Sequence, residues 1–218
     1  MRIDMADDVR LHGVKALRIA VLLSGSGTSL ENVFEHIDAG LPARVEVVVS
    51  SKRGAGGLAR AERHAVPAQV VSRRDHPDAG DFNDSLHAAL APYEIDLVAL
   101  LGFLSPFEPR ERFAGRVINV HPALIPAFCG KGFYGEKVHR AVLEAGVKVT
   151  GATVHFADDE YDHGPIILQR AVEVRDDDDP ASLGARVQAA ERELVPEALR
   201  LIAEGRLTVE GRRVRIKA

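Results

Sequence analysis

From residue 17 onward, short apolar runs alternate with longer stretches in which apolar positions recur every three or four residues. The first pattern is typical of strands buried on both faces of a parallel sheet, and the second of amphipathic helices. In the first half of the chain we predict strands at 17–23, 45–50, 68–71, 97–101 and 116–120, helices at 30–39, 56–65 and 81–91, and a connection at 107–113 that continues the alternation. This order predicts an α/β fold with a doubly wound, mostly parallel sheet and right-handed crossovers.

The second half of the chain has a different pattern. We predict a short helix at 138–145, two longer strands at 148–156 and 166–174, a long amphipathic helix at 181–203, and a closing hairpin at 206–209 and 213–216. Four acidic residues, Asp176 to Asp179, precede Pro180. Because acidic groups and proline are favoured at helix starts, this run predicts a solvated turn before the long helix.

Composition narrows the class of protein. With 218 residues and 46% hydrophobic content, the chain can bury one full core, so we predict a single domain over 17–218 preceded by a mobile extension at 1–16. A net charge of −4 and a pI near 6.1 give no electrostatic footprint for nucleic acid. Cys129 is the one cysteine, and no apolar run reaches membrane-spanning length. We therefore expect a cytoplasmic protein with no disulfide framework and no membrane partner.

Candidate chemistry centres on Asn119-Val120-His121-Pro122. These residues end an apolar strand, Pro122 cannot continue a central ladder, and the two polar side chains alternate onto one face. Ligands of open parallel sheets bind beyond the carboxyl ends of strands, where this pair would lie. The alternative is that Asn119 only caps a turn and that His121 is a satisfied buried imidazole.

Asp162 adds a carboxylate to this amide and imidazole. An amide N–H can stabilise the oxyanion of a tetrahedral intermediate, and the loss of such a donor typically costs about 3–4 kcal/mol of barrier. An imidazole can transfer protons near neutral pH, and a carboxylate can orient or charge it. Together the three groups predict the transfer of an acyl group onto an amine.

A second chemical signal is Ser24-Gly25-Ser26-Gly27-Thr28-Ser29, between the first strand and the first helix. Glycines let the backbone approach an anion, and a helix N-terminus supplies free N–H groups. The third glycine of a dinucleotide fingerprint is absent and no acidic residue ends the second strand, so we predict no NAD. The lysine of a nucleoside-triphosphate loop is also missing, which favours a phosphate monoester such as a sugar phosphate. The alternative is a glycine turn required by geometry alone.

These motifs resemble those of the phosphoribosylglycinamide formyltransferases, within the wider formyl-tetrahydrofolate transferase group. The resemblance runs from about residue 17 to the C-terminus. Its motifs are Ser-Gly-Ser-Gly-Thr-Ser at 24–29, Asn-Val-His-Pro-Ala-Leu-Ile-Pro at 119–126, Thr-Gly-Ala-Thr-Val-His-Phe at 150–156, and Tyr-Asp-His-Gly-Pro-Ile-Ile-Leu-Gln at 161–169. The resemblance implies a Rossmann-like fold with a phosphate-binding half at 17–118 and a catalytic and folate-binding half at 119–218.

The resemblance also implies roles for particular residues. The matching catalytic residues are Asn119, His121 and Asp162, with His155 supporting them from behind. The matching substrate-binding residues are Gly27, Thr28, Ser29, Gln188 and Glu191, the last of these for ribose hydroxyls. The matching folate-binding residues are Leu104, Ser105, Asn119, Asp158, Asp159, Glu160, Tyr161 and Asp162.

The implied reaction transfers the formyl group of 10-formyltetrahydrofolate, a co-substrate, to the amine of 5'-phosphoribosylglycinamide in purine biosynthesis. The amine attacks directly, Asn119 and protonated His121 stabilise the oxyanion, and Asp162 assists proton transfer. No metal is expected, because no His/Cys/Asp cluster has ligand spacing. Cys129 is expected to be structural, His139 to be a surface or packing residue, and a homodimer remains open.

The chain departs from the family pattern in three places. The turn at 102–107 is shorter and lacks an arginine, no arginine aligns near Asp78, and a glycine-rich loop at 128–135 replaces a Pro-Gly turn. Lys131 in that loop could reach an anion, or the loop could simply be solvated. The alternatives in function are a formyltetrahydrofolate deformylase, a sugar-nucleotide N-formyltransferase, and a non-enzymatic binder of phosphorylated metabolites.

Overall fold

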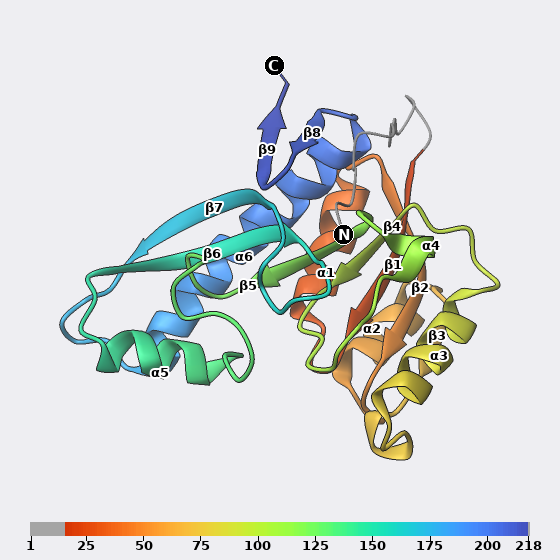
Figure 1. Cartoon of the computed structure of the whole chain (residues 1–218), viewed down its shortest axis with the longest axis horizontal. Coiled ribbons are helices and arrows are strands. Elements are labelled where there is room, and N and C mark those ends of the chain that lie inside the picture. Colours follow the sequence, from red (N-terminus) through yellow and green to blue (C-terminus); the bar gives the residue numbers. More distant parts are fainter. Residues whose placement is uncertain (1–15, 218) are drawn as a thin grey trace. The chain divides into compact units, whose positions relative to one another are not determined.

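The computed structural model describes residues 16–217, so most of the predicted N-terminal extension lies outside the described residues. Strands and helices alternate through the first half of the chain and give way to longer elements in the second (Figure 1). In chain order the elements are β1 (Leu17–Leu23), α1 (Thr28–Asp38), β2 (Ala43–Ser50), α2 (Gly56–Arg63), β3 (Ala68–Val70), a 3₁₀ turn (Arg73–Asp75), α3 (Ala79–Leu90), β4 (Leu97–Leu100), α4 (Arg110–Phe113), β5 (Val117–His121), α5 (Glu136–Glu144), β6 (Val149–Phe156), β7 (Ile166–Glu173), α6 (Pro180–Ala203), β8 (Leu207–Glu210) and β9 (Arg213–Ile216).

The chain forms two compact units, and the boundary between Ile118 and Asn119 falls within β5. In the N-terminal unit the strands are parallel and follow the order β3-β2-β1-β4. The chain moves outward from β1 to β3 and then returns to β4. Because such crossovers are right-handed, α1 and α2 cover one face of this sheet and α3 covers the other.

Helix α1 shows how the sequence determines the local structure of this unit. Its apolar residues Leu30, Val33 and Phe34 recur at helical spacing and are buried. Its N-cap is Gly27 in a left-handed conformation with φ 74°, and no side chain caps the helix. The helix therefore begins at Thr28, two residues before the predicted start, directly at the glycine loop.

In the C-terminal unit, β6 and β7 form a long antiparallel pair with a register shift between Val154 and His155. Strand β9 runs parallel to β7, and β8 closes a hairpin with β9. Helix α6 packs against β6 and β7, and α5 packs against α6 (Figure 1). The mixed α/β fold, with its mostly parallel central sheet and long C-terminal helix, confirms the predicted fold class.

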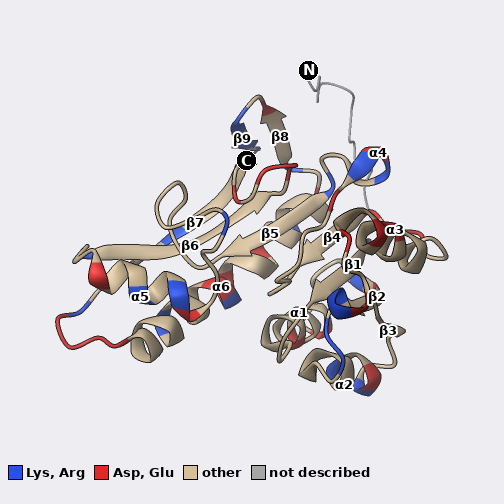
Figure 2. Ribbon diagram, turned by 60° about the horizontal axis from the view of Figure 1, so that its bottom comes forward, with Lys and Arg blue, Asp and Glu red and all other residues tan. Residues whose placement is uncertain are grey.

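The acidic turn before α6 is the red stretch at the left of Figure 2. Asp179 is the N-cap of the helix, and its side chain accepts a hydrogen bond of 2.7 Å from the Ser182 backbone N–H. The prediction of a solvated turn is wrong for Asp178, whose side chain is only 2% exposed and pairs with Arg186. The guanidinium beside Asp178 holds the pKa of that carboxyl well below its usual range.

Candidate active site

Asn119 and His121 lie at the end of β5, as predicted. Their side chains share a face of the strand because they are two residues apart, and both reach the carboxylate of Asp162. The Asn119 Nδ2 donates to Asp162 Oδ1 at 3.2 Å, and the His121 Nδ1 lies 3.4 Å from Asp162 Oδ2. The amide, imidazole and carboxylate proposed from the sequence therefore form one cluster.

Asp162 comes from the loop between β6 and β7. Its backbone is in the left-handed region with φ 54°, which aspartate tolerates better than most residues. The neck of this loop is tight, because a Cβ on Gly164 would lie 1.9 Å from the Phe156 carbonyl oxygen, and the Phe156 N–H donates to the Pro165 carbonyl at 2.9 Å. The paired ends of β6 and β7 therefore fix the position of Asp162 beside Asn119 and His121.

The Asp162 carboxylate is only 9% exposed, but it is well stabilised as an anion. Burial alone would raise its pKa. The Gly130 amide, and the attraction that the imidazoles of His155 and His121 exert in their protonated form, outweigh this, so the pKa lies below its ordinary value. The Gly130 N–H donates to Asp162 Oδ2 at 2.9 Å. The group is therefore a carboxylate at neutral pH.

The hydrogen bonds of His121 define its tautomer. Its Nε2 lies 2.9 Å from the Phe128 carbonyl oxygen, which can only accept, so Nε2 carries the hydrogen. Burial lowers the pKa of His121 below its ordinary value, although Asp162 opposes this, so the ring is neutral at neutral pH. Its free Nδ1 then faces a carboxylate oxygen. A proton between the His121 Nδ1 and the Asp162 carboxylate would form a favourable hydrogen bond with both groups. The pair can therefore accept a proton from an attacking amine.

His155 is 1% exposed and orients the Asn119 amide. Its Nδ1 donates to the Phe156 carbonyl at 2.8 Å, and its Nε2 accepts from Asn119 Nδ2, which lies at 3.2 Å. Both hydrogens of the amide are therefore directed at acceptors, and its two hydrogen bonds of 3.2 Å are long. Long bonds of this kind can be exchanged for a stronger bond to an oxyanion.

The loop at 128–135 contributes to the cluster in a way that the sequence analysis missed. The Phe128 carbonyl accepts from His121, and the Gly130 N–H donates to Asp162. Both are backbone groups, so no pattern of residue types in the sequence could identify them. Lys131 in the same loop is exposed. The Cys129 thiol donates to the Pro126 carbonyl at 3.3 Å, and burial together with Asp162 raises its pKa, so it remains a protonated thiol. His139 is 8% exposed and packs beside Gly184.

The glycine loop of the N-terminal unit is tightly backed by α2. A Cβ on Gly27 would lie 2.5 Å from the Cα of Gly57, and a Cβ on Gly57 would lie 2.4 Å from Leu23 Cδ2, so neither position has room for a side chain. The Arg60 Nε donates to the Ser26 carbonyl at 2.9 Å, and its NH1 donates to Glu31 at 2.8 Å. The predicted phosphate-binding residues Gly27, Thr28 and Ser29 are thus the N-cap and first turn of α1.

Gln188 and Glu191 lie on α6 in the C-terminal unit, one helical turn apart. Glu191 is half-buried, and burial raises its pKa to about 7. No hydrogen bond or ion pair joins it to another residue within 16–217. A desolvated carboxylate of this kind is costly unless a ligand supplies donors.

The predicted folate-binding residues fall in both units. In the N-terminal unit, the Leu104 side chain is 51% exposed, and its backbone N–H donates to Ser24 Oγ at 2.9 Å. In the C-terminal unit, the loop from Asp158 to Asp162 presents Tyr161, which is 57% exposed. Asp158 is tied to His163, whose Nδ1 lies 3.1 Å from the carboxylate.

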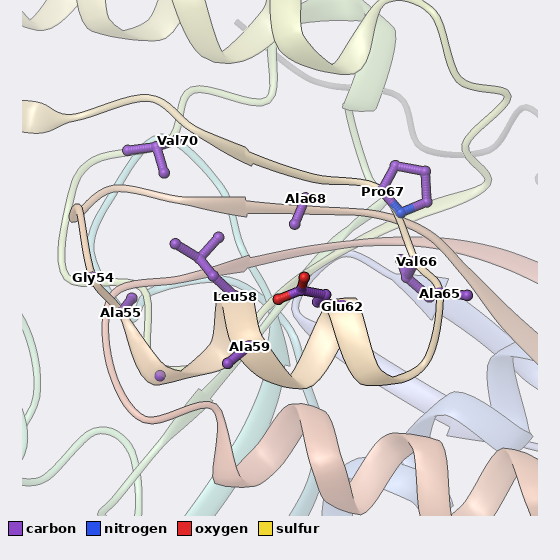
Figure 3. Close-up of a pocket in the computed structure, with 11 residues that line it drawn as sticks. Gly54, Ala55, Leu58, Ala59, Glu62, Ala65, Val66, Pro67, Ala68 and Val70 are labelled. Atoms are coloured by element: carbon purple, nitrogen blue, oxygen red, sulfur yellow. The ribbon is translucent and has the colours of Figure 1, made fainter.

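A separate groove of about 820 Å³ lies between α2 and β3 (Figure 3). Its lining is apolar, with residues such as Leu58 and Val70, and the Glu62 carboxylate points into it. It contains none of the predicted site residues. Over residues 16–217, no group of three or more His, Cys, Asp or Glu side chains is placed to hold a metal ion, and none of the described helices has the length and apolar content needed to cross a membrane.

Residues 17–199 match the model of the family described as formyl transferase. The chain belongs to the formyl transferase family. It is 38% identical over 210 residues to the phosphoribosylglycinamide formyltransferase of Mycobacterium tuberculosis, and the match covers 95% of each chain. The resemblance that the motifs indicated is thereby confirmed.

A solved structure in this family has a similar fold. Glycinamide ribonucleotide transformylase 1 from Symbiobacterium toebii has a TM-score of 0.86 and 44% identity, covering 93% of this chain and 94% of that one. The human trifunctional purine biosynthetic protein adenosine-3 is 37% identical over 196 residues. This chain spans only 19% of that longer protein.

Proposed function

We propose that this formyl transferase family member transfers the formyl group of 10-formyltetrahydrofolate to the amine of 5'-phosphoribosylglycinamide. The observation that carries the proposal is the cluster in which Asp162 contacts both Asn119 and His121. The names of the M. tuberculosis and S. toebii relatives support the choice of acceptor.

In the proposed reaction, the amine nitrogen attacks the formyl carbon and forms a tetrahedral intermediate with a negatively charged oxygen. Asn119 would turn one of its long N–H bonds from Asp162 or His155 to that oxygen. Such donors act strongly because the site is largely desolvated and needs little reorganisation. The reaction forms a new carbon–nitrogen bond and breaks the bond to N10 of the folate.

Proton transfer would pass through the position between His121 and Asp162. The attacking amine loses one proton and the departing N10 gains one, so no net proton is consumed. The His121 Nδ1 lone pair and the Asp162 carboxylate, 3.4 Å apart, would take the proton from the amine, directly or through a water. Because the ring is neutral before the reaction, we place its positive charge in the tetrahedral intermediate and not in the resting enzyme.

The phosphate and the ribose hydroxyls of the proposed acceptor each have candidate binding groups in this chain. The N–H groups at the start of α1, with Thr28 and Ser29, would hold the phosphate. Glu191 and Gln188 on α6 would receive the ribose hydroxyls. The unpartnered, desolvated Glu191 favours an acceptor rich in hydroxyl donors over water alone, which argues against the deformylase alternative.

The test is a spectrophotometric assay of 10-formyltetrahydrofolate turnover, with and without 5'-phosphoribosylglycinamide. We expect turnover only with the ribonucleotide, and a fall of about 100- to 1000-fold in kcat for Asn119→Ala. The matched control is Asn83→Ala, because Asn83 is also a buried amide, but within residues 16–217 its side chain bonds only to the Ala79 carbonyl and the Glu108 N–H. Turnover without the ribonucleotide would indicate the hydrolase, and an equal loss in both variants would refute the role of Asn119.

A further inference from the structure

Two motif residues, Thr153 and Gln169, have no role in the reaction described above, yet they form a dense hydrogen-bond network. Thr153 lies on β6 and is completely buried. Its hydroxyl donates to the Ala123 carbonyl at 2.7 Å, and it accepts from the Ile125 N–H at 3.1 Å and from the Gln169 Nε2 at 3.0 Å. A hydroxyl has one hydrogen and two lone pairs, so all of its hydrogen-bonding capacity is used.

Gln169 lies directly opposite Thr153 on β7. The second hydrogen of its amide reaches the Ile125 carbonyl, with a nitrogen–oxygen distance of 3.0 Å. Both backbone groups of Ile125 are therefore held by side chains of the β6–β7 pair, although Ile125 itself belongs to the connection after β5. The Leu124 side chain packs against the β6–β7 pair, since a Cβ on Gly151 would lie 2.8 Å from the Leu124 Cδ2.

The connection held in this way leads directly to the cluster. Its residues follow His121 and Pro122, and a tight turn closes it, because the Ala127 N–H donates to the Leu124 carbonyl at 2.9 Å. Phe128 comes next in a left-handed conformation with φ 51°, and its carbonyl accepts from His121 Nε2. Only Pro126 and Ala127 lie between the clamped Ile125 and Phe128, so a shift at Ile125 is transmitted to the Phe128 carbonyl.

We infer that Thr153 and Gln169 are positioning residues, which clamp the 123–128 connection so that the Phe128 carbonyl keeps the hydrogen of His121 on Nε2 and leaves Nδ1 facing Asp162. The inference rests on the proposed function for its kinetic consequence, because only a proton-accepting His121 makes the tautomer matter for rate. The tautomer itself can be observed without any substrate. Misplacement of a reacting group by about 1 Å can lower a rate by about 100-fold.

The experiment compares Thr153→Val, Thr153→Ser and Gln169→Ala with the wild-type chain. Valine keeps the shape of Thr153 but removes the hydroxyl, whereas serine keeps the hydroxyl. Gln169 is exposed, so its alanine variant should fold even if Thr153→Val does not. The matched control is Gln69→Ala, because among the residues that the structure describes the Gln69 amide bonds only to Tyr93, at 3.3 Å, in the N-terminal unit.

The decisive readout is the 15N NMR signature of the His121 ring, assigned with His121→Gln, together with kcat and KM. In the wild type and in Thr153→Ser we expect a single Nε2–H tautomer. In Thr153→Val and Gln169→Ala we expect a mixture of tautomers and a kcat lower by about 10-fold or more, with KM values within about twofold. The control should match the wild type.

The inference would be overturned by an unchanged His121 tautomer in Gln169→Ala and in any folded Thr153→Val, or by a serine variant as impaired as the valine variant. Loss of thermal stability with a wild-type tautomer and kcat would show a structural role only. If the wild-type chain transfers no formyl group, the proposed function fails, but the tautomer comparison still decides whether the clamp positions His121.

Discussion

Replacement of Glu191 by glutamine should stabilise the folded chain, and the gain should grow with pH. Desolvation by burial raises the pKa of this carboxyl from its ordinary value of 4.5 to about 7. Between these values the folded chain holds a proton that the unfolded chain has released. The stability of the wild type therefore falls as pH rises from 4.5 to about 7 and then levels off.

The size of this effect follows from the same two values. Each factor of ten in proton affinity corresponds to about 1.4 kcal/mol, so the interval from 4.5 to about 7 gives an upper limit of roughly 3.4 kcal/mol. The Glu191 side chain retains some contact with solvent, which reduces the penalty. We expect Glu191→Gln to raise the free energy of unfolding by about 2–3 kcal/mol at pH 8 and by less than about 1 kcal/mol at pH 5.

Urea unfolding of the wild type and Glu191→Gln at pH 5 and pH 8 measures this difference. Glu193→Gln is the matched control on the same helix, because that carboxylate is 62% exposed and pairs with Arg170 on the surface. Its effect should be small and the same at both pH values. A gain in Glu191→Gln that does not change with pH would refute the reasoning. In the formyl-transfer assay the same variant should raise the KM for the ribonucleotide more than it lowers kcat, because the amide accepts ribose hydroxyls less strongly.

Three further substitutions test other parts of the structure. Asp162→Asn keeps a residue that tolerates the left-handed backbone, so kcat should fall by about 100-fold or more while the melting temperature stays close to wild type; near-normal turnover would contradict the proton-transfer role. Gly27→Ala places a Cβ 2.5 Å from the Cα of Gly57 at φ 74°. It should lower the free energy of unfolding in urea by about 2 kcal/mol or more and raise the KM for the ribonucleotide. If both quantities stay unchanged, α2 does not pack tightly behind the glycine loop. Gly151→Ala places a Cβ 2.0 Å from the Arg170 carbonyl oxygen across the β6–β7 pair. It should lower the free energy of unfolding by about 3 kcal/mol. A variant as stable as the wild type would show that the two strands can move apart at this point without loss of stability.

The elements of the fold could be predicted because their patterns are local. The apolar runs of β1 and β4 are buried on both faces, and the periodicity of α1 and α6 reports which side of each helix packs. Boundaries were less accurate. The predicted start of α1, at residue 30, lies two residues late, because the helix is capped by the backbone conformation of Gly27 and by no side chain.

For the candidate site, the sequence indicated the side chains but not the backbone groups that bind them. The positions of Asn119 and His121 after an apolar strand indicated chemistry, and the structure brings Asp162 to both of them. The backbone partners of the cluster, at Phe128 and Gly130, could not be identified, since any residue type supplies a carbonyl. Their positions depend on hydrogen bonds between residues far apart in the chain, such as Ile125 with Thr153, which no local pattern encodes.

The tight neck between Phe156 and Gly164 has a consequence for how this family can diversify. Because the two ends of the loop are joined by the sheet, the entropic cost of closing the loop changes little when residues between them are replaced or added. The exposed positions from Asp159 to Tyr161 can therefore vary without disturbing β6 or β7. Exchanging these exposed positions between relatives would therefore test whether they contact the proposed folate, with β6 and β7 left unchanged.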